Sequence, residues 1–144
     1  MIRSIARLMS EQSAAYTSLE SLTGQLAAAL TRGEPTLIEP LTRAGDAELS
    51  RMRARLLEIT TKLTEFSRVR AGDASGTPIE ASIREEFEKT STELTTKARS
   101  YASVASRAAS LAITGSTFAA TRIQMCGVSP TTYKPPILRA TTAA

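Results

Sequence analysis

Few side chains in this chain could carry out catalysis or bind a metal. Across its 144 residues there is no histidine, and Cys126 is the only cysteine. These absences exclude Ser-His-Asp and Cys-His nucleophilic sites, histidine-based zinc sites and an intrachain disulfide. Glu85, Glu86 and Glu88 are close in sequence, but neighbouring helical positions face apart and nothing places these carboxylates in a cleft. We therefore predict that the protein is not an enzyme and holds no cofactor or metal.

The composition indicates closely packed helices rather than a sheet. Apolar residues make up 42% of the chain, yet there is no tryptophan, and there are only three phenylalanines and three tyrosines. Much of the remainder is alanine and leucine, and small residues let helices approach closely. We predict an all-α, antiparallel three-helix bundle or coiled-coil hairpin with a long C-terminal helix, as one domain over residues 1–127. A flexible, proline-containing tail is expected over residues 128–144.

The first two predicted helices each carry one seam of apolar or small residues. Spacings of three and four residues alternate along the first seam, as in helices that pack in a left-handed coil. Gly33 is expected to end the first helix, and the second becomes regular from about Pro40, because proline is unfavourable in a helix interior. The first seam consists of Ile5, Leu8, Gln12, Ala15, Leu19, Leu22, Leu26 and Ala29. The second consists of Leu41, Gly45, Leu49, Met52, Leu56, Ile59, Leu63 and Phe66.

The third predicted helix is the longest. It is expected to start with Thr77 as N-cap, Pro78 at the first helical position and Glu80 completing a capping box. A helical period then continues to Cys126, which gives a helix of about 70 Å, against about 45 Å for each of the first two. Either this helix breaks near Gly115, or its C-terminal end projects and needs cover from elsewhere.

The last third of the chain is entirely basic. No acidic residue follows Glu93, although the net charge of the whole chain is only +4. The cations are Lys97, Arg99, Arg107, Arg122, Lys134 and Arg139. They either complement the dipole of a helix that starts with acidic residues, or attract an acidic partner surface. Nucleic acid is not expected as a partner, because the cations are spread out and no RNA or DNA motif is present.

The run SYASVASRAASLAITGSTFAA in the third helix is rich in small residues. Such residues allow a tight seam within the protein, and equally they offer a smooth groove for the larger side chains of a partner's helix. Both interpretations stay open, because burial cannot be read from a sequence.

Nothing in the sequence indicates secretion or membrane insertion. Arg3, Arg7 and Glu11 interrupt the apolar residues at the N-terminus, which argues against a secretion signal. The longest uncharged stretch near the C-terminus, residues 108–121, is shorter than the roughly 20 residues of a membrane span. We therefore expect a cytoplasmic protein.

The stretch LAAALTRGEPTLIEPLTRAGDAELSRMRARLLEI resembles the FlgN family of flagellar export chaperones. In that family a leucine-rich helix end is followed by a turn of glycine and an acidic residue, and then by a second leucine-containing helix. The matching residues are Leu26, Leu30, Gly33, Glu34, Leu37, Ile38, Leu41 and Leu49. The third helix and the ending TTYKPP also resemble the family's close. The chain departs from the family pattern at Pro35 and Pro40, in its Ala/Thr-rich third helix and in its extended tail.

The resemblance implies a cytoplasmic type III flagellar secretion chaperone. Such a protein binds hook-filament junction (hook-associated) proteins through its C-terminal helix and delivers them to the export gate. Tyr133 would contact the export gate. The residues expected to bind the client are Leu111, Ile113, Phe118, Ile123 and Met125. The alternative is a structural coiled-coil or oligomeric scaffold, in which a second copy of the chain completes the seam.

Overall fold

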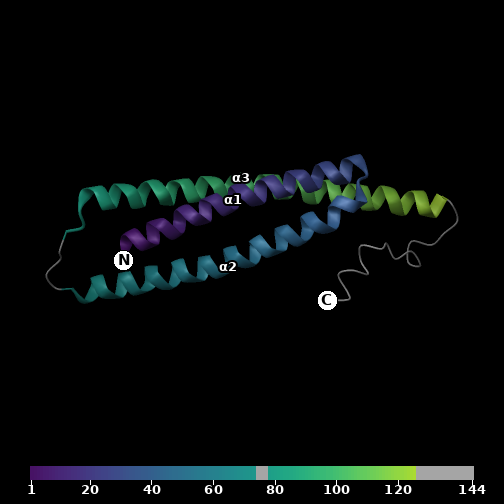
Figure 1. The fold of residues 1–144 in the computed structure, drawn as a ribbon. Coiled ribbons are helices and arrows are strands. Elements are labelled where there is room, and N and C mark those ends of the chain that lie inside the picture. The colour runs from purple at the N-terminus through teal and green to yellow at the C-terminus, as the bar shows by residue number, and fades with distance from the viewer. Residues whose placement is uncertain (74–77, 126–144) are drawn as a thin grey trace.

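The computed structural model describes residues 1–73 and 78–125, and all the regular structure in this range is helical (Figure 1). Helix α1 spans Ile2–Arg32, α2 spans Pro35–Gly72 and α3 spans Ala81–Met125. The chain runs along α1, returns along α2, and then follows α3 in the direction of α1. The prediction of an all-α, antiparallel three-helix assembly with a long C-terminal helix is confirmed. The predicted tail, residues 128–144, lies outside the described residues.

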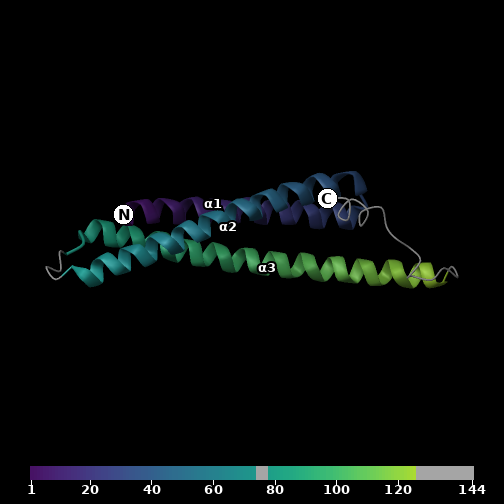
Figure 2. The same ribbon diagram turned by 90° about the horizontal axis from the view of Figure 1, so that it is seen from below.

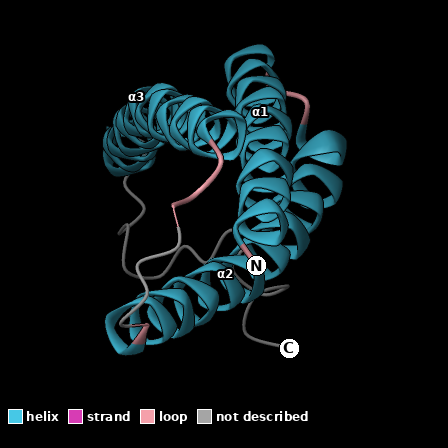
Figure 3. Cartoon of the chain, turned by 90° about the vertical axis from the view of Figure 1, so that its left-hand side faces the viewer, coloured by secondary structure: helices cyan, strands magenta, loops and turns pink. Residues whose placement is uncertain are grey.

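Helix α1 is the central element of the fold. It packs against both α2 and α3, whereas α2 and α3 make only marginal contact with each other. Figure 3 shows α2 and α3 on different sides of α1. Among the described residues, seven of the buried apolar side chains belong to α1 and the other two, Met52 and Ile59, belong to α2. Helix α1 therefore supplies most of the core.

Two adjoining seams on α1 explain this position. The predicted seam faces α2, where Leu8 clusters with Ile59, and Leu19 clusters with Met52. Every position of the second seam follows one residue after a position of the first, and all its members are buried or half-buried. The second seam consists of Ala6, Met9, Ser13, Tyr16, Glu20, Thr23 and Ala27. Its spacing was visible in the sequence, but its small and polar residues hid it from a search for apolar periodicity.

The second seam packs against α3. The rings of Tyr16 and Tyr101 lie side by side, with centroids 5.7 Å apart. One turn further along, the carboxylate of Glu20 accepts a hydrogen bond from the hydroxyl of Ser100 at 2.9 Å. These contacts hold α3 parallel to α1 and fix its register along α1.

Gln12 is the one polar residue in the predicted α1 seam, and it is fully buried. Its side-chain amide donates a hydrogen bond to the carbonyl of Met52 at 3.4 Å, and its oxygen accepts one from the Arg55 guanidinium at 3.1 Å. Arg55 also lies 3.6 Å from the carboxylate of Glu11. A buried amide is tolerated where its hydrogen bonds are made, and at a seam position such bonds favour one register of the two helices.

Replacing Gln12 with Ala should lower the free energy of unfolding by about 2–3 kcal/mol, because the change leaves a cavity and removes a hydrogen bond from Arg55. Gln25 lies on the exposed side of the same helix, so Gln25→Ala should change stability by less than about 0.5 kcal/mol. Urea unfolding followed by circular dichroism measures both variants. Equal, small effects would show that Gln12 is not enclosed between α1 and α2.

The end of α1 agrees with the prediction, and the start of α2 does not. Gly33 takes a left-handed conformation with φ 66°, and the N–H groups of Gly33 and Glu34 bond back to Leu30 and Ala29, as in a Schellman motif. Helix α2 begins at Pro35 and includes Pro40, so the expected regular start near Pro40 was wrong. Pro40 removes only one main-chain hydrogen bond near the helix start, and the surrounding turns continue past it.

The predicted start of the third helix was also wrong. Pro78 and Glu80 precede the first helical residue, Ala81, and the carbonyl of Glu80 accepts hydrogen bonds from the N–H groups of Ile83 and Arg84, both at 3.1 Å. Half-buried Ile79 lies beside the start of α1 and the end of α2, and we attribute the late start to this packing. Thr77 lies outside the described residues.

Helix α3 is continuous through Gly115, so its end projects instead of breaking. With 45 residues against 31 in α1, it is about 68 Å long against about 47 Å. Figures 1 and 2 show its C-terminal end beyond the turn between α1 and α2. One predicted seam residue of α2, Leu56, is 42% exposed. Because α2 and α3 scarcely touch, no third helix covers that flank of the seam.

Candidate protein-binding surface

The described residues hold no cluster of side chains that could bind a metal ion, since no group of three or more cysteine or acidic residues among them is arranged to do so. None of the three helices, as far as they are described, is long and apolar enough to cross a membrane.

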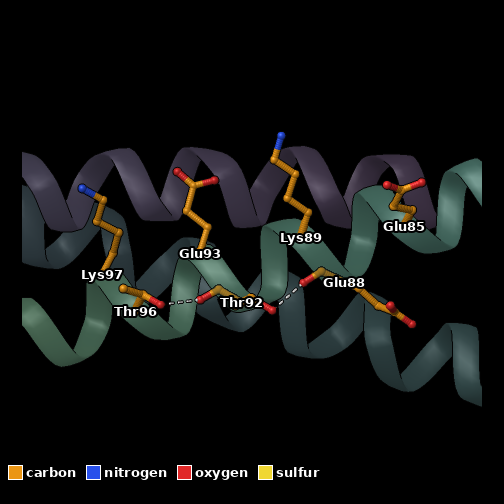
Figure 4. A pocket seen from close by; sticks show the side chains of 7 residues that line it. All are labelled: Glu85, Glu88, Lys89, Thr92, Glu93, Thr96 and Lys97. Carbon is orange, nitrogen blue, oxygen red and sulfur yellow. Dashed lines mark hydrogen bonds between the residues drawn. The ribbon is translucent and has the colours of Figure 1, made fainter.

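One shallow hollow, of about 610 Å³, is lined by residues of α3 alone (Figure 4). Acidic and basic residues alternate along it every four residues, a spacing at which opposite charges on a helix attract each other. The alternating residues are Glu85, Lys89, Glu93 and Lys97. On the neighbouring row, the hydroxyls of Thr92 and Thr96 bond back to main-chain carbonyls of the same helix. Six of the seven lining residues are exposed, Lys97 is half-buried, and the carboxylates of Glu85 and Glu88 do not converge in a cleft.

A smaller hollow of about 220 Å³ lies where the start of α1, the end of α2 and the start of α3 meet. Its apolar lining is Ile2, Ile5, Phe66, Ile79 and Phe87, with Arg84 and Glu88 at its edge. The sequence singled out several of these residues as seam positions but gave no sign that they would leave a gap. Because five of its seven lining residues are apolar, few polar groups could orient a ligand there, and we attribute the hollow to imperfect packing at the end of the bundle.

The residues predicted to bind a partner lie on the projecting end of α3 or beyond it. Leu111, Ile113 and Met125 are 50%, 67% and 80% exposed. Positions 118 and 123 are part of the helix, but the side chains of Phe118 and Ile123 lie outside the described structure, as does Tyr133. The exposure of the three described side chains fits a surface available to a partner.

These residues do not all share one face, which corrects the predicted set. At 3.6 residues per turn, position 113 lies about 160° around the helix from position 111, and position 123 lies about 120° away. Position 125 lies only about 40° from position 111. Leu111 and Met125 therefore belong to one stripe, with position 118 midway between them, and Ile113 faces nearly the opposite way.

The stripe is the continuation of the seam that packs on α1. From Ile83 to Met125, seam positions follow each other at alternating spacings of four and three residues without interruption. The covered part is half-buried and consists of Ile83, Phe87, Thr90, Leu94, Lys97, Tyr101, Val104 and Ala108. We call the remainder, positions 111, 115, 118, 122 and 125, the uncovered seam, because Leu111, Gly115, Arg122 and Met125 are exposed to solvent; the side chain at position 118 is not described. The sequence contained this pattern too, but Thr90, Lys97 and Gly115 obscured it.

The small-residue run divides at the point where the cover ends. Tyr101, Val104 and Ala108 are half-buried, so the first part forms a seam within the protein. In residues 109–117 every side chain is exposed. Each of the two interpretations that the sequence left open thus fits one part of the run.

Replacing Gly115 with Ala tests whether this chain packs on the end of α3. A Cβ built at Gly115 meets no atom within 4 Å, and alanine stabilises a helix interior by roughly 0.5–1 kcal/mol relative to glycine. We expect slower amide hydrogen exchange in residues 109–125 and stronger helical circular dichroism.

Gly33→Ala serves as the opposite control. Gly33 also has open space around it, but its φ of 66° disfavours any side chain, so this change should lower stability by about 1 kcal/mol. Faster exchange around position 115 in Gly115→Ala would mean that another part of the chain approaches there.

The chain matches no protein-family model, no curated protein and no solved structure. The fold and surface define an all-α helical-bundle protein with an uncovered helical seam.

Proposed function

We propose that this protein is a chaperone that binds a helical segment of a client protein through the projecting end of α3. The observation that carries the proposal is the exposure of Leu111 and Met125 on a seam that is covered only as far as Ala108. A helix laid along such a stripe can bury apolar side chains on both partners, as in helix-in-groove recognition. Only the end of one helix is involved, so the contact is small enough to be released.

The resemblance to the FlgN family supplies the proposed client and setting. The client would be a hook-associated protein held before export, and the chaperone would work in the cytoplasm and deliver it to the flagellar type III export gate. Segments held unfolded for export order on binding, which lowers their affinity and favours release. Tyr133 remains the proposed contact to the export gate.

A structural or oligomeric scaffold is the second candidate. The marginal contact between α2 and α3 leaves Leu56 exposed as well as the end of α3. A second copy of the chain covering these flanks would complete a larger bundle. Light scattering of the free chain, with and without a client peptide, separates the two candidates. A tight dimer whose mass does not change when the peptide is added would favour the scaffold.

Two truncations test the proposed chaperone function. A chain ending at Met125 should bind the C-terminal peptide of a hook-associated protein as the full chain does, with an almost unchanged thermal midpoint. A chain ending at Ala109 should lose this binding, while its midpoint falls by no more than a few degrees, because nearly all the described side chains of residues 110–125 are exposed. Calorimetric titration and thermal circular dichroism provide the two readouts.

Either of two results would contradict the proposed site. Retained peptide binding in the shorter chain would place the binding surface on the α1–α2 hairpin or the first part of α3. A steep fall in the thermal midpoint would show that residues 110–125 stabilise the bundle and are not reserved for a partner.

A further inference from the structure

We propose that the uncovered seam receives an acidic amphipathic helix, which takes on the end of α3 the place that α1 takes on its first part. The inference rests on the proposed function in using the same end of α3, and it goes further by naming the chemistry of the partner. The partner helix has apolar residues at alternating spacings of three and four, and acidic residues flank that seam. About 17 residues would match the uncovered length of α3, which is roughly 25 Å.

Continuity with the α1–α3 interface identifies the partner as a helix. A spacing of three and four residues keeps one stripe facing one partner helix along a left-handed coil. On α3 this spacing continues for more than two heptads after Ala108, the last half-buried seam residue before the uncovered part. Tyr16 is level with Tyr101, so seven-residue steps place Thr23 level with Ala108. Beyond that level Figure 2 shows α3 apart from the α1–α2 hairpin.

Gly115 points to a close approach by the partner. Glycine weakens a helix interior, yet apart from the neighbouring turns of α3 itself no atom in the described part of the chain lies within 4 Å of a Cβ built there. Neighbouring Ala112 and Ala119 are also small and exposed. A flat strip of this kind lets a partner backbone come near and accepts larger side chains from it.

Charge decides between a foreign helix and a second copy. Arg107 is exposed and directly precedes the seam residue Ala108. In coiled coils, residues at such a flanking position form charge pairs with the partner helix. Every charged residue after Glu93 is basic, so two copies joined through this end would bring like charges together. Residues 126–144 supply no acidic residue either, and they contain three prolines. An acidic amphipathic helix from another protein would match the spacing of the uncovered seam and complement the basic residues beside it.

Two synthetic peptides test the proposal on the full-length chain. Both have about three heptads with leucine at the seam positions, and they differ only in flanking glutamate or flanking lysine. Fluorescence anisotropy of labelled peptide should show binding of the glutamate peptide and at least about tenfold weaker binding of the lysine peptide. The preference should shrink as ionic strength rises.

Matched variants locate the binding on the uncovered seam. Leu111→Glu should weaken binding of the glutamate peptide by at least about tenfold, whereas Ile113→Glu, on the other side of the same helix, should change it by less than about twofold. Arg107→Glu should weaken binding of the glutamate peptide by about threefold and strengthen binding of the lysine peptide. Arg99→Glu makes the same charge change on the outer face and should affect both peptides by less than about twofold. Circular dichroism checks that all four variants keep their helices.

Several results would overturn the inference. These are equal binding of the two peptides, equal effects of Leu111→Glu and Ile113→Glu, or a dimer of the free chain that dissociates on Leu111→Glu in sedimentation. Failure of this inference is distinguishable from failure of the proposed chaperone function. Binding of a hook-associated client that is insensitive to Leu111→Glu supports the chaperone and overturns the seam. If the chain binds the glutamate peptide selectively but does not bind a hook-associated protein, the inference about the uncovered seam is supported and the proposed client is rejected.

Discussion

The structure depends on the burial of α1 on two adjoining sides. The two seams of α1 are offset by one residue, and each recruits a different helix, so α2 and α3 are both held without meeting. Large residues such as Leu8 and Leu19 face α2, whereas the α3 side combines Met9 and Tyr16 with the small Ala6 and Ser13. The two seams of α1 differ in their side chains, and close packing against them sets the positions of α2 and α3.

The core that results is narrow, and surface charges add little to it. The closest approach of Arg3 and Glu80 is 3.9 Å with both side chains more than 70% exposed, and such pairs contribute at most about 1 kcal/mol. Gln12 and Arg55 form the polar contact that spans α1 and α2 inside the bundle. Stability therefore rests on a short stretch of buried side chains, and the far end of α3 lies outside it. That end can hold unusual residues, such as Gly115 in a helix interior, at little cost to the fold.

The division of α3 into covered and uncovered parts links the fold to the proposed function. The covered part fixes the helix on α1 through Tyr101 and its neighbours, and this rigid support presents the uncovered part as a preformed helix. For the proposed chaperone function, a preformed surface means that little of this chain has to become ordered on binding, so the ordering entropy would come mainly from the proposed client segment. Every charged residue beyond Glu93 is basic, and in the proposed interaction this single sign of charge would favour acidic helices over others of similar shape.

The sequence by itself determined the three helices, the left-handed end of α1 at Gly33 and the buried seam from Ile5 to Ala29, because periodicity and capping are local properties. It also contained the stripe of Leu111 and Met125 and the opposite placement of Ile113, since both follow from helical geometry. Only the tertiary structure decided that α1 is central, that Leu56 is uncovered and that α3 starts at Ala81 after the packed Ile79. These features depend on which seams meet in space, and non-local contacts settle that choice where local propensity leaves several arrangements open.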